Sequence, residues 1–265
     1  MANMIEQGVS VSGQGPVVVF LHSSLSSSKQ WANLAAQLSE HFTCINIDLL
    51  GYGNASAACE KNYNFTIETT RINTIISQVA PSEKFHLVGH SCGGAIALKI
   101  AVEQPEKLLS LSLFEPVAFH LLALSHNENH NALARDVENF AEKLASVSQQ
   151  QGAEAFIDFW NGEGFFAKLP HKIQTTMIEQ FTKVKLDFIG ILQERYSFEA
   201  LQVIQCPCLL MVGKYSKAVS HVLSQAIAQS LKHVEYKEIS SGHMAPISHP
   251  NLVQPLISSF IYHVK

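Results

Sequence analysis

The chain has 265 residues, of which 47% are hydrophobic and only 15% charged, and its formal net charge is −4. A typical globular chain carries about 25% charged residues, so this composition excludes an intrinsically disordered chain and a coiled coil. A mildly acidic balance argues against nucleic acid or an anionic membrane as the main partner. A small molecule is therefore the expected partner.

Cysteine usage and the N-terminal residues predict a soluble, cytoplasmic protein. The five cysteines are Cys44, Cys59, Cys92, Cys206 and Cys208. Their scatter and odd number fit a reducing compartment. Residues 1–8 lack the basic start and apolar stretch of a signal peptide, and no apolar run approaches the roughly 20 residues of a membrane helix. The oligomeric state stays open, with a homodimer as one alternative.

Short apolar runs alternate with amphipathic helical stretches along most of the chain. The predicted strands are residues 4–11 (the weakest), 16–21, 42–48, 84–89, 108–114, 207–213 and 234–239. The predicted helices are residues 29–39, 67–79, 92–104, 219–231 and 251–263. This alternation predicts an α/β fold, with a mainly parallel central sheet and helices on both faces.

Residues 119–200 interrupt the alternation, because they show helical periodicity and no convincing strand. Phe156, Phe159 and Trp160 share one helical face, and this segment holds 9 of the 15 phenylalanines and 11 of the 22 acidic residues. We therefore predict a helical cap over an apolar pocket, inserted in a core domain of residues 1–118 and 201–265. The alternative is an ordinary amphipathic helical subdomain.

The sequence Gly-His-Ser-Cys-Gly at residues 89–93 follows a predicted strand and opens a predicted helix. At a sharp turn between a strand and a helix, the glycines permit tight backbone packing, and the Ser91 side chain projects beyond the end of the strand. The Cys92 amide, at the N-terminus of the helix, then points toward an oxyanion formed at Ser91. The alternative is a glycine turn with an incidental serine.

In this motif and its context the chain resembles the α/β-hydrolase superfamily, from about residue 16 to the C-terminus. The resemblance implies a hydrolase without cofactor or metal and with Ser91 as nucleophile. A serine argues against the chemistry of epoxide hydrolases and haloalkane dehalogenases, because those reactions form an alkyl ester on a carboxylate.

A serine hydroxyl needs a base that takes its proton, and His243 is the candidate among thirteen histidines. It follows the last predicted strand in Ser-Gly-His-Met-Ala-Pro, residues 241–246, which looks like the catalytic Gly-His loop of the superfamily. The alternative is a solvated loop histidine.

The acid of the predicted triad departs from the common pattern. Most relatives place an Asp where this chain has Ser216, and residues 201–234 contain no Asp or Glu. Glu115 follows the neighbouring predicted strand, whose end converges on the same edge, and a minority of the superfamily places its acid there. One alternative is that Glu115 only caps the junction between the core and the cap, while His243 works without an acid. Another is that Glu238 is the acid, although its position in the middle of a strand makes it the weaker candidate.

Two backbone donors are expected for the oxyanion, the amides of Cys92 and Ser24. Ser24 is assigned by resemblance, since relatives have His-Gly-x where this chain has His22-Ser23-Ser24. Ser23 in place of the glycine is a second departure from the pattern.

These residues predict a serine hydrolase, specifically a carboxylesterase for small apolar esters, acting through an acyl-enzyme on Ser91. One alternative is a C–C bond hydrolase of acidic, β-diketone-like substrates, which a cation inside the pocket, such as Arg135 or Arg195, would favour. Another is a ligand-binding protein with little turnover. His126 and His130 are four residues apart, but no third metal ligand is evident.

Overall fold

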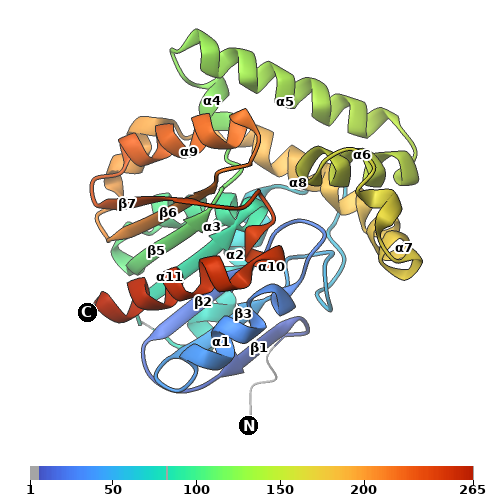
Figure 1. The fold of residues 1–265 in the computed structure, drawn as a ribbon. Helices are drawn as coiled ribbons and strands as arrows, with labels where there is room; N and C mark the ends of the chain where they lie inside the picture. The colour runs from blue at the N-terminus through green and yellow to red at the C-terminus, as the bar shows by residue number, and fades with distance from the viewer. Residues whose placement is uncertain (1–5, 82, 265) are drawn as a thin grey trace.

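A computed structural model describes residues 6–81 and 83–264, and a seven-stranded sheet forms its centre (Figure 1). The strands are β1 (Val9–Ser12), β2 (Val17–Leu21), β3 (Thr43–Ile47), β4 (Phe85–His90), β5 (Leu108–Phe114), β6 (Cys208–Gly213) and β7 (Val234–Ile239). Their order in the sheet is β1-β3-β2-β4-β5-β6-β7. β1 pairs antiparallel with β3, and every other neighbouring pair is parallel.

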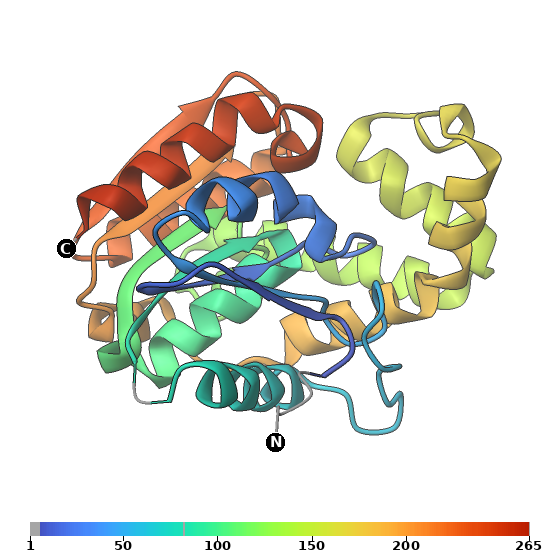
Figure 2. The ribbon, with the colours of Figure 1, turned by 90° about the horizontal axis from the view of Figure 1, so that it is seen from below.

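Helices cover both faces of this sheet (Figure 2). The helices are α1 (Ala32–Leu38), α2 (Phe65–Val79), α3 (Ser91–Glu103), α4 (His120–Ala123), α5 (Glu128–Ser146), α6 (Gln149–Asn161), α7 (His171–Glu179), α8 (Phe181–Gln193), α9 (Ala218–Ser230), α10 (Ala245–Ser248) and α11 (Pro250–His263). Four short 3₁₀ helices add Ser28–Trp31, Pro105–Lys107, Phe166–Lys168 and Phe198–Val203. The predicted α/β fold is confirmed.

Alternate side chains of one strand build two separate cores. Val18 and Phe20 of β2 pack with α1 and α11, whereas Val17, Val19 and Leu21 pack on the face covered by α2, α3 and α9. Successive strand side chains point to opposite faces. The strand is therefore buried on both sides, which explains why its sequence is a continuous apolar run.

The N-terminal strand is shorter than the sequence predicted. β1 begins at Val9, whereas the prediction began at residue 4, and residues 4 and 5 lie outside the described part of the chain. β1 is an antiparallel edge strand in which half-buried and exposed positions alternate. Its hydrophobic signal is therefore weaker than that of the central strands.

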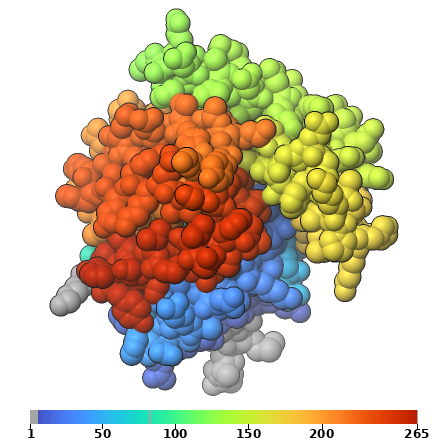
Figure 3. Space-filling model, in the orientation of Figure 1, coloured from blue at the N-terminus to red at the C-terminus, as the bar shows by residue number. Residues whose placement is uncertain are grey.

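Within the described residues 115–207 the chain forms helices and no strand. In Figure 1 helices α4 and α5 lie above the sheet and helices α6 and α7 lie to its right. In the space-filling view (Figure 3) their green and yellow surface lies beside the orange and red C-terminal part. The predicted boundary at residue 200 falls inside the 3₁₀ helix Phe198–Val203. The division into core and cap stays a prediction, and we refer to residues 119–200 as the helical segment.

No helix within residues 6–81 and 83–264 has both the length and the apolar character that a membrane crossing demands.

Candidate active site

The parallel register brings the carboxyl ends of the central strands to one edge. Leu21 of β2 pairs with Gly89 of β4, and His90 of β4 pairs with Phe114 of β5. The loops after these strands therefore start side by side, as ligand-binding loops do in parallel α/β sheets.

Ser91 occupies a sharp turn between β4 and α3. β4 ends at His90 and α3 begins at Ser91, whose φ of 54° is unusual for a residue other than glycine. The turn packs closely on its surroundings, because a Cβ on Gly93 would lie 2.4 Å from the carbonyl oxygen of His22. Glycine at position 93 thus lets the end of β2 approach the turn that carries Ser91.

His243 lies between Ser91 and Glu115. Its Nε2 is 3.0 Å from Ser91 Oγ and its Nδ1 is 2.7 Å from Glu115 Oε2. All three residues are buried. Because an ionised carboxylate only accepts hydrogen bonds, Nδ1 carries the proton of a neutral imidazole, and Nε2 is free to accept the proton of Ser91.

Glu115 is held as an ionised carboxylate by several donors. Its Oε1 accepts hydrogen bonds from the Gly213 amide at 2.6 Å and from Ser216 Oγ. Burial raises the pKa of Glu115, but the hydrogen bonds from His243, Ser216 and Gly213 outweigh burial and lower the pKa to about 2. Ser216, which occupies the usual position of the acid, thus supports the carboxylate supplied by the neighbouring strand.

Two further rings, those of Trp160 and His90, contact His243. The Trp160 ring of α6 stacks on it with centroids 3.7 Å apart and an angle of 19° between the planes. His90 Nε2 donates a hydrogen bond of 2.9 Å to the His243 carbonyl oxygen. Burial lowers the pKa of His90 to about 3, so this ring stays neutral and can hold that contact near neutral pH.

The loop after β2, residues 22–25, lies beside Ser91, and we call it the oxyanion loop. His22 Nδ1 donates to the Ser23 carbonyl oxygen at 2.7 Å, and His22 Nε2 accepts from the Leu49 amide at 2.9 Å. The Ser23 amide donates to Gln30 Oε1 at 3.2 Å. Leu25 has a positive φ of 54°. Side-chain hydrogen bonds thus hold a loop that lacks the glycine of the superfamily pattern.

The two predicted oxyanion donors, Ser24 and Cys92, both lie close to Ser91. Ser24 lines the same cavity as Ser91. Cys92 is in the first turn of α3, where backbone N–H groups have no partner within the helix. The Cys92 side chain is fully buried, and burial raises the pKa of its thiol. The roles of both amides stay predictions.

A small cavity of about 30 Å³ meets Ser91 and His243. The apolar part of its lining consists of Leu25, Phe156, Ile157, Trp160, Met177 and Met244. A more open groove of about 510 Å³ shares four lining residues with this cavity: Trp160, Asn161, His243 and Met244. Trp160 is the largest of the four, and it borders both the cavity at Ser91 and the open groove.

The other candidates from the sequence lie elsewhere. Glu238 is exposed on β7, and Arg135 and Arg195 are exposed on the helical segment and line neither space. His126 is also exposed, and no group of three metal-ligating side chains occurs among the residues that the structure describes.

The sequence did not predict the contact between Trp160 and His243, the support that Ser216 gives to Glu115, or the charged residues of α8 described below. The apolar spacing of residues 156, 159 and 160 was the only local signal for the first of these.

Comparisons with known proteins identify the family to which the chain belongs. Residues 16–250 match the family described as the alpha/beta hydrolase fold. The chain is 30% identical to a fluoroacetate dehalogenase of Burkholderia sp, over 95% of this chain and 88% of that protein. It is 24% identical to a pimeloyl-[acyl-carrier protein] methyl ester esterase of Aeromonas salmonicida, over 94% of this chain and 96% of that protein.

Among solved structures, an enol-lactonase from Burkholderia xenovorans superposes with a TM-score of 0.75 at 16% identity, covering 97% of this chain and 96% of that chain. At this identity the likeness concerns the fold. Together with the match over residues 16–250, these similarities show that the chain is a hydrolase that belongs to the α/β hydrolase fold family.

Proposed function

We propose that this hydrolase uses Ser91 as its nucleophile and cleaves small, largely apolar carboxylic esters. The observation that carries the proposal is the continuous contact from Ser91 Oγ through His243 to Glu115, at 3.0 and 2.7 Å. This is the arrangement by which a base activates a serine hydroxyl and an acid orients the base.

In the first half of the reaction Ser91 Oγ attacks the ester carbonyl carbon while His243 Nε2 takes its proton. The Cys92 and Ser24 amides bind the oxyanion, and Glu115 stabilises the imidazolium. The tetrahedral intermediate then breaks its bond to the alkoxy oxygen, which receives the proton from His243. The alcohol leaves, and the acyl group stays on Ser91.

In the second half His243 takes a proton from water as the water oxygen attacks the acyl carbon. The new tetrahedral intermediate breaks its bond to Ser91 Oγ, which recovers the proton from His243. The carboxylic acid leaves, and no other reactant is needed. One imidazole thus serves as base and then as acid in each half.

The lining of the cavity supports an uncharged substrate. Apolar side chains form most of it, and no lysine or arginine occurs among the residues that line it. An acidic group beside Ser91 would lose hydration without gaining a countercharge there, since Lys217 lines the open groove and not this cavity. This observation favours ester hydrolysis over the alternative of C–C bond cleavage.

The proposed serine nucleophile argues against dehalogenase activity in this chain. A carboxylate that displaces a halide forms an ester that water can cleave, whereas a serine would form an ether that the same site cannot hydrolyse. We therefore expect no fluoride release from fluoroacetate, as measured with a fluoride electrode. Catalytic fluoride release would contradict the assignment of Ser91.

Turnover of a graded substrate series tests the proposal. The series contains para-nitrophenyl acetate, butyrate and octanoate and one acidic β-diketone, with Ser91→Ala as the matched control. We expect turnover of the short esters by the wild type and its loss in Ser91→Ala. Turnover of the diketone alone would favour the C–C hydrolase, and no turnover of any substrate would favour a binding protein.

A further inference from the structure

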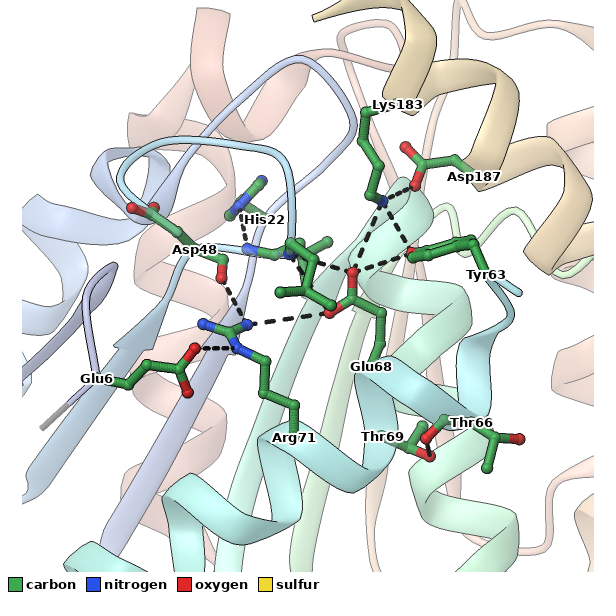
Figure 4. A network of polar contacts seen from close by, with 12 residues as sticks. Glu6, His22, Asp48, Tyr63, Thr66, Glu68, Thr69, Arg71, Lys183 and Asp187 are labelled. Carbon is green, nitrogen blue, oxygen red and sulfur yellow. Dashed lines mark hydrogen bonds and ion pairs between the residues drawn. The ribbon is translucent and has the colours of Figure 1, made fainter. Parts of the chain in front are cut away.

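Two oppositely charged side chains of α8 are buried beside the oxyanion loop. Lys183 and Asp187 are one helical turn apart and are 4% and 1% exposed (Figure 4). They form an ion pair with each other. Burying a charge is costly unless it is paired and hydrogen-bonded, so the further contacts of this pair indicate what it stabilises.

Asp187 connects the helical segment to the oxyanion loop. Its Oδ1 accepts a hydrogen bond from Lys183, and its Oδ2 accepts one from Tyr52 at 2.6 Å and one from Ser24 Oγ at 2.5 Å. Ser24 is the residue whose amide is the predicted second oxyanion donor. A carboxylate of α8 therefore binds directly to a residue of the proposed catalytic machinery.

Lys183 anchors this carboxylate to the core of the protein. Its Nζ donates to the Tyr63 hydroxyl oxygen at 2.8 Å and lies 3.7 Å from Glu68 Oε1. Tyr63 in turn donates to Glu68 at 2.9 Å, and Arg71 lies 4.0 Å from the other Glu68 oxygen. Arg71 also forms a closer ion pair of 2.8 Å with the exposed Glu6. Lys183 is therefore the cation that lies directly against the Asp187 carboxylate.

The oxyanion loop needs an external constraint of this kind. It has Ser23 where the superfamily pattern has glycine, and Leu25 adopts a left-handed conformation. A strained backbone conformation persists only where surrounding contacts over-determine it. A catalytic group displaced by about 1 Å can cost roughly 100-fold in rate.

We propose that Asp187 is a positioning residue for ester hydrolysis. Asp187 accepts the hydrogen bond of the Ser24 hydroxyl and so holds the Ser24 amide where the oxyanion forms. Lys183 offsets the negative charge of Asp187, which would otherwise repel that oxyanion. Catalysis thereby depends on the docking of α8. The inference rests on the proposed function, because only a reaction with an oxyanion uses this amide.

Single variants that break the hydrogen bond from either side provide the first test. Ser24→Ala keeps the amide and removes the hydroxyl, whereas Asp187→Asn removes the charged acceptor. With para-nitrophenyl acetate we expect kcat to fall about tenfold or more in each, with KM within about threefold, because the displaced donor weakens transition-state binding more than substrate binding. Ser24→Thr, which keeps the hydroxyl, should restore most of kcat.

A matched control separates positioning from general stability. Tyr63→Phe removes two hydrogen bonds of the same cluster, those with Glu68 and Lys183, and leaves the contact between Ser24 and Asp187 in place. We expect it to lower the melting temperature while kcat stays near the wild-type value. An equal loss of kcat in Tyr63→Phe would overturn the inference, because the effect would then belong to the cluster as a whole.

The double variant Ser24→Ala/Asp187→Asn completes the test. If Asp187 acts through Ser24, the double variant loses no more kcat than the worse single variant, and binding of a trifluoromethyl ketone, which forms a tetrahedral adduct, weakens in parallel. Multiplicative losses, or folded single variants with unchanged kcat, would overturn the inference. A wild type that hydrolyses no ester would instead count against the proposed function.

Discussion

Glu115 stands at the carboxyl end of β5, and its carboxylate reaches sideways to the loops that follow β6 and β7. It receives hydrogen bonds from Gly213, Ser216 and His243, and its own backbone has a positive φ of 41°. A strained residue with three donors on its carboxylate is typical of a functional site rather than of a helix or strand cap.

We expect Glu115→Gln to lower kcat for short esters by roughly two to four orders of magnitude, because an amide cannot orient His243 and stabilise its imidazolium as a carboxylate does. Glu238→Gln, at an exposed position of β7, is the matched control and should retain activity. Near-normal turnover by a folded Glu115→Gln variant would contradict the proposed role of this residue.

The sequence predicted Glu115 indirectly. Residues 201–234, where the acid is expected, contain no carboxylate, so the acid had to come from another strand. The contacts of Asp187 could not be inferred in the same way. Ser24 and Asp187 are separated by 163 positions in the chain, and neither lies in a motif that relates it to the other. Such a contact depends on how α8 docks, which local patterns do not specify.

At the scale of elements, α6 carries the ring that covers His243. Trp160 borders both the cavity of about 30 Å³ at Ser91 and the open groove beyond it. A cavity of this volume holds about one water molecule. An ester larger than the smallest acyl groups must therefore displace Trp160 or its neighbours on entering.

We expect Trp160→Ala to shift the preference of the enzyme towards longer acyl chains. The ratio of kcat/KM for para-nitrophenyl octanoate to that for the acetate should rise about tenfold or more, since each methylene accommodated in an apolar pocket contributes about 1 to 3 kcal/mol. Phe165→Ala changes a residue that lines only the open groove and should leave the ratio unchanged. An unchanged ratio in Trp160→Ala would show that Trp160 does not limit chain length.

Helices α6 and α8 approach each other closely at Gly152. A Cβ at this position would lie 2.1 Å from the ring of Phe181, so Gly152→Ala should lower the free energy of unfolding by about 1 to 3 kcal/mol through overpacking. Urea unfolding measures this loss, with Gln150→Ala at an exposed site of the same helix as the control. Equal free energies of unfolding of the two variants would contradict the close packing of α6 against α8 at Gly152.

The elements themselves could be predicted because their signals are local. The central strands are apolar throughout since both faces are covered, and all the predicted helices occur with boundaries close to those expected. Inside the helical segment the prediction was coarser. Met177 and Phe181 continue one apolar spacing, yet α7 ends at Glu179 and α8 begins at Phe181, and the spacing alone does not locate that break.

For the molecule as a whole, buried histidines set the response to acid. Burial lowers the pKa of His22 and His86 from 6.5 to about 4, and that of His90 and His120 to about 3. In the unfolded chain these rings bind protons at higher pH than in the folded protein. The folded state is therefore favoured above the unfolded pKa and loses stability as the pH falls below it.

We expect the free energy of unfolding to fall between about pH 6.5 and pH 5, by up to about 1.4 kcal/mol per pH unit for each such histidine. Urea titrations at several pH values measure this slope. His86→Gln should reduce it by up to about 1.4 kcal/mol per pH unit, the contribution of one bound proton. A slope of zero across this interval would contradict the burial of these four rings as neutral groups.

Every step of the proposed reaction passes through an acyl group on Ser91, so covalent trapping of this serine is the decisive measurement. The folded protein is treated with a fluorophosphonate, its mass is measured, and the modified residue is located by peptide mapping, with Ser91→Ala treated in parallel. We expect one adduct, on Ser91, in the wild type and none in the variant. No adduct on the folded wild type, or an adduct that persists in Ser91→Ala, would contradict it.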